Sequence, residues 1–180
     1  MGELDRGVGR GRRGRLRLAD AATLLAVATV VLLVSLPRLR DFALRENQGD
    51  ARGLVARLGR LLDDEVHAAE VGNVQDAIAG DPALARQLED VEYLEHGRLL
   101  RRHGYLFEVL PGAAPQRVTV RAWPWEHGRT GLASFVWIAH RGLAGHPNTD
   151  GRWTGTGGGP APVFAGSASP DGDGWRLVED

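Results

Sequence analysis

The sequence predicts an α+β fold, in which a long N-terminal helix packs on a small antiparallel sheet. Apolar residues recur with helical spacing from about Ala19 to Ala69, and after Tyr105 they recur at every second position in three stretches. Between His140 and Gly174 the chain is mostly Gly, Pro, Asn, Asp, Ser and Thr, which predicts an irregular C-terminal region.

The first part of the predicted helix is apolar enough to cross a membrane. The span Ala21–Leu36, bounded by Asp20 and Pro37, is apolar apart from a few hydroxyl residues. As a helix, residues 19–36 would rise about 27 Å, close to the roughly 30 Å of hydrocarbon in a bilayer. Six arginines precede the span, and they are Arg6, Arg10, Arg12, Arg13, Arg15 and Arg17. Because arginine is retained on the cytoplasmic side, we predict a basic cytoplasmic leader at 1–18 and a transmembrane helix at 19–37.

Two alternatives exist for this apolar span. A cleaved secretory signal peptide would need a site of small residues after the apolar core, and the chain reads Val34-Ser35-Leu36-Pro37-Arg38 there. A buried helix of a soluble protein would not need the arginine cluster. We therefore favour an uncleaved anchor that leaves the rest of the chain outside the cytoplasm.

The helical period continues after Pro37, which is expected to kink the helix because proline removes a backbone donor. Leucines then follow at helical spacing on one face, at Leu54, Leu58, Leu61 and Leu62, with charged residues opposite. Residues 38–72 are therefore predicted to be an amphipathic helix that continues the anchor and ends near Gly72.

Residues 73–180 are predicted to form a small extracytoplasmic α+β domain. Asp81-Pro82 indicates the start of a second helix that runs to about Leu88. Alternation then predicts three antiparallel strands, with a fourth strand allowed near 175–178. The alternating sets are Tyr105, Phe107 and Val109, then Val118, Val120 and Ala122, then Ala133, Phe135, Trp137 and Ala139, and the turn signals are Pro111-Gly112 and Glu126-His127-Gly128.

Composition narrows the function classes. The chain has no cysteine, which excludes disulfides and thiol chemistry. The first forty positions are strongly basic and the rest of the chain is net acidic. Because the arginines of the basic part are explained as topology determinants, we expect no nucleic-acid partner. The six histidines show no HExxH spacing, the run Gly155–Gly159 lacks a following lysine, and no Gly-x-Ser-x-Gly elbow occurs. We therefore expect the protein not to be an enzyme.

Two weak metal candidates lie in the C-terminal region. His140 and His146 flank a glycine loop near Asp150, although solvated loop histidines are commoner than ligands. Asp171 and Asp173 resemble part of a calcium loop but lack its downstream glutamate, so a surface turn is the simpler interpretation. We predict no metal and no cofactor, with calcium at these two aspartates as the alternative.

All five tryptophans follow residue 120, and they are Trp123, Trp125, Trp137, Trp153 and Trp175. Indole rings in a small sheet domain usually pack in the core. The alternative is an aromatic binding face.

The order of these features resembles the type IV pilin and type II secretion pseudopilin family. Asp20 and Pro37 match in spacing a glutamate and a proline of its N-terminal helix, and Leu36–Ala43 resembles the continuation into the amphipathic half. His103–Phe107, and Ala122-Trp123-Pro124 followed by Gly128–Gly131, resemble a Gly-Tyr strand and the hairpin after it in bacterial pilin-like proteins.

The resemblance implies a pilin-like fold and a structural subunit of a bacterial secretion or pilus system. Its partners would be other pilin-like subunits, an inner-membrane secretion platform and membrane lipid, in the bacterial inner membrane. In the family a leader peptidase cuts after a glycine, whereas Arg15 occupies that position here, between Gly14 and Leu16. We therefore expect the basic N-terminus to be retained.

The resemblance also implies a role for Asp20 in setting the register between neighbouring subunits. A carboxylate inside hydrocarbon costs roughly 2.5–3.5 kcal/mol on insertion scales and therefore needs a partner. The alternative is that Asp20 pairs with Arg17 or lies in the headgroup region. A signal-anchored extracytoplasmic binding domain that does not polymerise is the alternative function.

Overall fold

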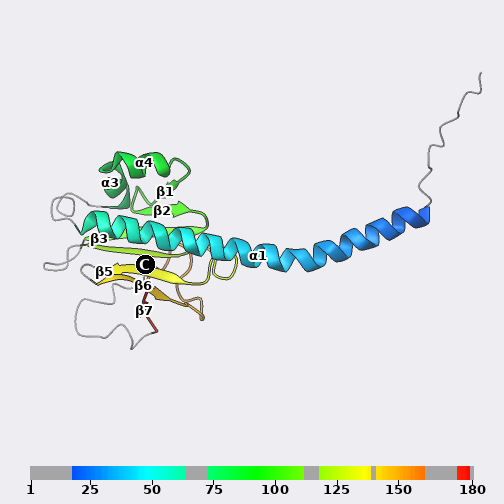
Figure 1. Cartoon of the computed structure of the whole chain (residues 1–180). Coiled ribbons are helices and arrows are strands. Elements are labelled where there is room, and N and C mark those ends of the chain that lie inside the picture. The colour runs from blue at the N-terminus through cyan, green and yellow to red at the C-terminus, as the bar shows by residue number, and fades with distance from the viewer. Residues whose placement is uncertain (1–17, 64–72, 112–117, 139–140, 161–173, 179–180) are drawn as a thin grey trace, which may run out of the picture. The chain divides into compact units, whose positions relative to one another are not determined.

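The computed structural model describes residues 18–63, 73–111, 118–138, 141–160 and 174–178. It divides into two compact units, residues 1–40 and residues 41–180. The described residues form one long helix, two short helices and a seven-stranded antiparallel sheet (Figure 1). The predicted α+β class is therefore confirmed.

The long helix α1 (Leu18–Leu62) contains Pro37 and belongs to both units. In the first unit its large apolar side chains are between 56% and 71% exposed, and they are Leu24, Leu25, Val27, Val30, Val31, Leu32, Leu33, Val34, Leu36 and Leu39. In the second unit α1 buries one face through Ala51, Leu54, Val55, Leu58 and Leu62. The helix ends at Leu62, before the end predicted near Ala69 or Gly72, and residues 64–72 lie outside the described part.

Two short helices follow. α3 (Val74–Ala79) begins after Asn73, whose side chain accepts a hydrogen bond of 3.0 Å from the Asp76 amide. α4 (Pro82–Gln87) begins after Asp81, whose carboxylate accepts from the amides of Ala83 and Leu84 at 2.8 and 3.2 Å. The cap and the proline at the first helical position confirm the second helix predicted from the sequence.

The sheet is a meander in which each strand pairs only with its neighbours in the chain. Its strands are β1 (Glu92–Leu94), β2 (Leu99–Arg102), β3 (Tyr105–Pro111), β4 (Val118–Pro124), β5 (Ser134–Ile138), β6 (Gly142–His146) and β7 (Arg176–Leu177). The predicted sets correspond to β3, β4 and β5, and the fourth strand allowed near 175–178 is β7. The expectation of an irregular chain after His140 is wrong at β6, which pairs with β5 over its whole length.

Each face of the sheet carries its own apolar core. Tyr105, Phe107 and Val109, all at most 2% exposed, pack in the first core with Leu58 of α1. The alternate residue Leu106 packs on the opposite face, in a second core with Trp123, Val136, Trp153 and Trp175. The predicted inward face of β3 is therefore confirmed. Its other face is also buried, because residues of 142–160 and 174–178 pack against it in the second core.

Candidate functional site

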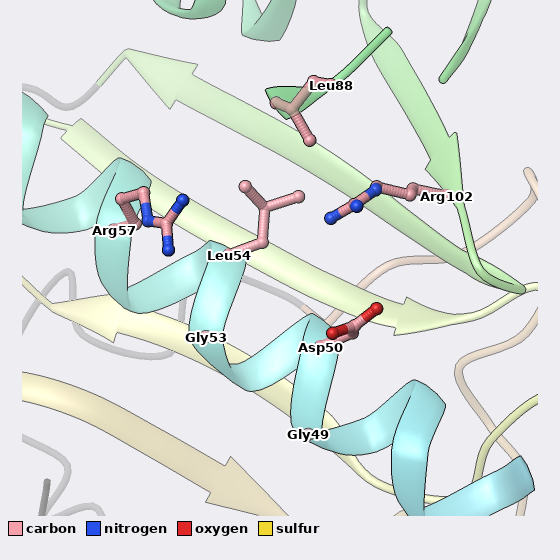
Figure 2. Close-up of a pocket in the computed structure, with 7 residues that line it drawn as sticks. All are labelled: Gly49, Asp50, Gly53, Leu54, Arg57, Leu88 and Arg102. Carbon is pink, nitrogen blue, oxygen red and sulfur yellow. The ribbon is translucent and has the colours of Figure 1, made fainter. Parts of the chain in front are cut away.

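One candidate site is a cleft of about 380 Å³ beside α1, which we call the helix cleft. It is lined by Gly49, Asp50, Gly53, Leu54, Arg57, Leu88 and Arg102. Figure 2 shows the guanidinium groups of Arg57 and Arg102 on opposite sides of Leu54, with Asp50 below. The cleft thus combines an apolar floor with charges of both signs.

The spacing of two glycines opens this cleft. Gly49 and Gly53 lie four residues apart and therefore on the same face of α1. A Cβ atom added at either position would meet no atom within 4 Å. Because both glycines leave the helix surface bare, the neighbouring side chains line a hollow and do not fill it.

A second cleft of about 450 Å³, which we call the tryptophan cleft, lies along β1, β2 and the turn that follows β2. It is lined by Asp90, Val91, Glu92, Arg101, Arg102, His103, Gly104, Trp125 and Thr130. Arg102 lines both clefts. The two candidate sites are therefore neighbours on the same unit.

The turn between β2 and β3 shapes the boundary between the clefts. Arg102 pairs with Tyr105, so His103 and Gly104 form a two-residue hairpin loop. Their φ angles are +44° and +75°, the left-handed values that such loops favour. Gly104 also lies against Thr130, where a Cβ atom would overlap the threonine side chain. The turn therefore needs glycine at this position for both its φ angle and its packing.

A polar network centred on His103 contributes lining residues to both clefts. Nδ1 of His103 contacts a carboxylate oxygen of Asp50 on α1, and Nε2 lies 3.1 Å from Asp90 Oδ2. Arg102 donates from Nε to Asp90 Oδ1 at 3.2 Å. The network joins α1 to the turn and to the residues before β1. The side chains of Asp50, His103 and Asp90 are 42–55% exposed, so each ion pair contributes little stability by itself.

The charges around Asp90 set its ionisation. Desolvation acts to raise the pKa of the Asp90 carboxyl, but the Arg102 guanidinium, hydrogen bonds and His103 together lower it below its usual value. Asp90 is therefore held as a carboxylate between Arg102 and His103.

The side chains that line the clefts are better suited to binding a ligand than to attacking one as a nucleophile. The described residues that line them include one hydroxyl side chain, that of Thr130. Its Oγ1 accepts from the Glu126 amide at 3.0 Å and donates to the Glu126 carbonyl at 3.2 Å. The side chains that remain to contact a ligand are the charged ones and the aromatic ring of Trp125.

A further polar cluster lies on the face of the sheet that carries the second core. Glu108, 1% exposed, accepts from Arg121 Nε at 2.7 Å and from Arg98 Nη1. Arg121 also donates to the Pro160 carbonyl and lies over the ring of Trp123, 5.3 Å from its centroid. This cluster connects β3 and β4 to Pro160, in the segment after β6, and so ties the described part of that segment to the sheet.

Of the residues selected from the sequence, the structure describes Asp20 and Pro37, and neither of them lines a cleft. Asp20 lies in the first turn of α1 and is exposed, and Pro37 lies inside the same helix. Gly14, Arg15 and Leu16 lie outside the described residues, as do Asp171 and Asp173. The processing and calcium hypotheses therefore stay predictions.

His146, one of the weak metal candidates, packs among aromatic rings at the second core. The His146 ring is 8% exposed and packs 4.8 Å from the Trp153 ring and 5.3 Å from that of Trp175. Its Nδ1 accepts from the Asn148 amide at 2.8 Å, and Nε2 lies 3.2 Å from Arg152 Nη2. In the described part of the chain no three His, Asp or Glu side chains gather as a metal site. His140 lies outside that part.

Four of the five tryptophans pack in the cores, and one lies where it could contact a ligand. Trp123, Trp137, Trp153 and Trp175 are at most 8% exposed and belong to the two cores. Trp125 is half-buried and lines the tryptophan cleft. Core packing therefore accounts for most of the indoles, and one is left for binding.

Sequence reasoning missed the clefts because β1 and β2 were not predicted. The two turns that bound β2 contain Gly97 and Gly104, which are the local signals that could have indicated them. Nothing in the sequence places Asp50 of α1 beside His103, since that contact depends on how the helix crosses the sheet. The buried position of Glu108 was not predicted either, since it depends on pairing with Arg121 of β4.

No family model, curated protein or solved structure matches this chain.

Proposed function

We propose that the protein is a membrane-anchored, pilin-like structural subunit of a bacterial secretion or pilus system. The observation that carries the proposal is the change in burial along α1. Its apolar side chains from Leu24 to Leu39 are more than half exposed, whereas Leu54, Leu58 and Leu62 are buried against an antiparallel sheet. One helix thus serves as an apolar segment and as a core element of a folded domain.

The exposed half of α1 fits a lipid environment better than water. Within the described residues it is the helix long and apolar enough to span a bilayer. Ten large aliphatic side chains in water would form an apolar patch far beyond what monomeric proteins usually expose. Their exposure also argues against the soluble-core alternative, in which the same side chains would be covered. The topology that follows is single-pass in the bacterial inner membrane, with the domain outside the cytoplasm.

Asp20 supports assembly through its place in the helix. It precedes the apolar segment, where a carboxylate is costly unless a positive group stabilises it. In an assembly of pilin-like subunits a neighbouring chain can supply that group, so that Asp20 fixes the axial register. The partners would be other pilin-like subunits and the inner-membrane platform.

Crosslinking within the membrane tests this assembly. Since the chain has no cysteine, Val27→Cys introduces a unique thiol in the apolar helix. We expect oxidation in native membranes to give a crosslinked species with a pilin-like subunit carrying a matching cysteine, and Asp20→Ala to reduce it. Asp41→Ala, which removes an acidic residue of α1 beyond the apolar segment, is the matched control and should leave the yield unchanged. No crosslink in the Val27→Cys variant alone would refute assembly, and an unchanged yield when Asp20→Ala is added to it would refute the register role.

The mass of the mature protein tests processing. We expect it to retain its basic N-terminus, because Arg15 stands where the leader peptidase of the family needs glycine. An N-terminus at Leu16, especially a methylated one, would contradict this expectation and strengthen the assembly proposal.

A second function is favoured by the tryptophan cleft. A binding domain on a signal anchor needs a rigid, partly apolar hollow with polar groups, and this cleft provides one. Such a protein would be anchored as a monomer, so the absence of the Val27 crosslink would favour it over the structural subunit.

A further inference from the structure

Trp125 is presented to the tryptophan cleft from a fixed backbone. Its amide donates to the Gly104 carbonyl at 2.8 Å, and its carbonyl accepts from the Gly155 amide at 3.0 Å and from Thr154 Oγ1 at 3.2 Å. The indole packs on the edge of the second core and lines the cleft. A half-buried indole held in this way offers a flat apolar surface at little entropic cost on binding.

The charged groups of the cleft occur in opposite pairs. Arg101 forms an ion pair with Glu92, and Arg102 forms one with Asp90. The guanidinium of Arg101 also lies 5.1 Å from the centroid of the Trp125 ring. Two carboxylates balance two guanidinium groups, and His103, which also lines the cleft, contacts Asp90 as well, so no charged side chain of the cleft lacks a partner within it. The cleft presents hydrogen-bond donors and acceptors in equal measure around one aromatic surface.

We propose that the tryptophan cleft binds a neutral sugar ring. The apolar C–H face of a pyranose would lie on the Trp125 indole beside the Arg101 guanidinium, which lies over the same ring. The sugar hydroxyl groups would exchange hydrogen bonds with Asp90, Glu92 and Arg101. A hydroxyl both donates and accepts, so it can satisfy carboxylates and guanidinium groups together. A purely apolar ligand would displace water from these partly exposed ion pairs without replacing its hydrogen bonds, which is costly. A charged ligand would meet a like charge in either orientation.

This inference supplies a ligand class for the binding function proposed above as the second candidate, and a subunit of an assembly could carry the same site. The sugar assay and the Val27 crosslink are independent measurements. Failure of one therefore leaves the result of the other readable.

The test is binding of neutral oligosaccharides to the full chain in a detergent without a sugar head group. The probes are the β1,4-linked trisaccharides of N-acetylglucosamine and of glucose and the α1,4-linked trisaccharide of glucose, with trigalacturonate as the anionic comparison. Titration calorimetry gives the dissociation constant, and saturation-transfer NMR shows which sugar protons contact the protein. We expect at least one neutral trisaccharide to bind, with the strongest transfer to protons on one face of a ring.

Variants assign the binding to the cleft. Trp125→Ala should weaken it by about tenfold or more, whereas Trp125→Phe, which keeps an aromatic surface, should weaken it less. Glu92→Ala removes a half-exposed carboxylate without disturbing a core, and it should also weaken binding. Tyr93→Ala, which removes an exposed aromatic ring of β1 outside the cleft lining, is the matched control and should bind as the parent does.

Three results would overturn the inference. The first is that no neutral trisaccharide binds the parent chain. The second is that both Trp125→Ala and Glu92→Ala bind as tightly as the parent. The third is that trigalacturonate binds more tightly than every neutral probe. If Trp125→Ala loses its near-ultraviolet circular dichroism, Trp125→Phe and Glu92→Ala decide the outcome.

Discussion

Gly59 of α1 lies directly against the indole ring of Trp137 in β5. A Cβ atom at this position would overlap the Cγ and Cδ2 atoms of the indole. The indole Nε1 also donates to Asp63 Oδ2 at 3.3 Å, one helical turn further along the chain. Gly59 therefore sets how closely α1 approaches the sheet, and Trp137 fixes where the helix crosses it.

Gly59→Ala should destabilise the domain despite the better helix propensity of alanine. Relieving the overlap requires moving the helix or the indole, and overpacking of this kind costs about 1–3 kcal/mol. Gly53→Ala is the matched control, because a Cβ atom there meets no atom within 4 Å. It should gain up to about 1 kcal/mol from helix propensity. Urea unfolding of the full chain in detergent, followed by near-ultraviolet circular dichroism, measures both. Equal effects of the two changes would contradict the close packing of Gly59.

Phe107→Ala should cost roughly 3–5 kcal/mol, because the ring is 1% exposed within the first core. That loss is large compared with the total stability of a small domain. Leu132→Ala, at a side chain that is 43% exposed, should change stability by less than about 0.5 kcal/mol. The same unfolding measurement compares the two variants. An unchanged midpoint for Phe107→Ala would contradict the burial of Phe107 in the first core.

Glu108→Ala should be far more damaging than the loss of an exposed glutamate. It leaves the Arg121 guanidinium, only 13% exposed, without its carboxylate, and breaking such a pair costs about 3–5 kcal/mol. Glu126→Ala removes the exposed ion pair with Arg129 and should cost less than about 1 kcal/mol. If the two variants unfold at the same urea concentration, Glu108 does not tie the described part of the segment after β6 to the sheet.

The contribution of Asp90 to stability should disappear in acid. The folded protein lowers the pKa of this carboxyl below its usual 3.8, so its stabilising effect is present above pH 3.8. It is lost as the pH falls through the lower folded pKa. The difference in urea midpoint between the parent and Asp90→Asn should therefore be constant near neutrality and shrink below pH 3.8. High salt should also reduce it, since the side chain is exposed. A difference that grows in acid would contradict the ion pair with Arg102.

A topology reporter tests the anchor. Alkaline phosphatase fused after Asp180 should be active in intact bacteria, because arginines before the apolar helix retain the N-terminus in the cytoplasm. A fusion to residues 1–18 alone, which lacks the helix, should be inactive. Activity of a cytoplasmic reporter fused after Asp180 would exclude both proposed functions.

The sequence predicted those elements whose residues carry their own signal. Asp81 caps α4 and Pro82 is its first residue, and both preferences depend only on the local sequence. Tyr105, Phe107 and Val109 alternate clearly enough to place β3 and its inward face. These signals are local, so a single chain is sufficient to read them.

The missed elements depend on contacts between distant residues. β6 has the sequence Gly-Leu-Ala-Gly-His, which has little β propensity, and it is held by pairing with β5. In β2, Leu99 and Leu100 are adjacent and face opposite cores, so no alternation is visible. The clefts follow from these strands and from α1, and they could not be predicted before them.

The order of the sheet bears on how the chain can fold as it leaves the machinery that makes or exports it. Each strand from β2 to β7 pairs with the one made just before it. Contacts between neighbours in the chain close short loops, and proteins rich in them fold quickly. α1 precedes all the strands, so its leucine face is already present when β3 is delivered. From β1 to β6 the sheet can therefore grow on the helix in the order of synthesis, and only β6 has to wait through a long segment for its outer partner, β7.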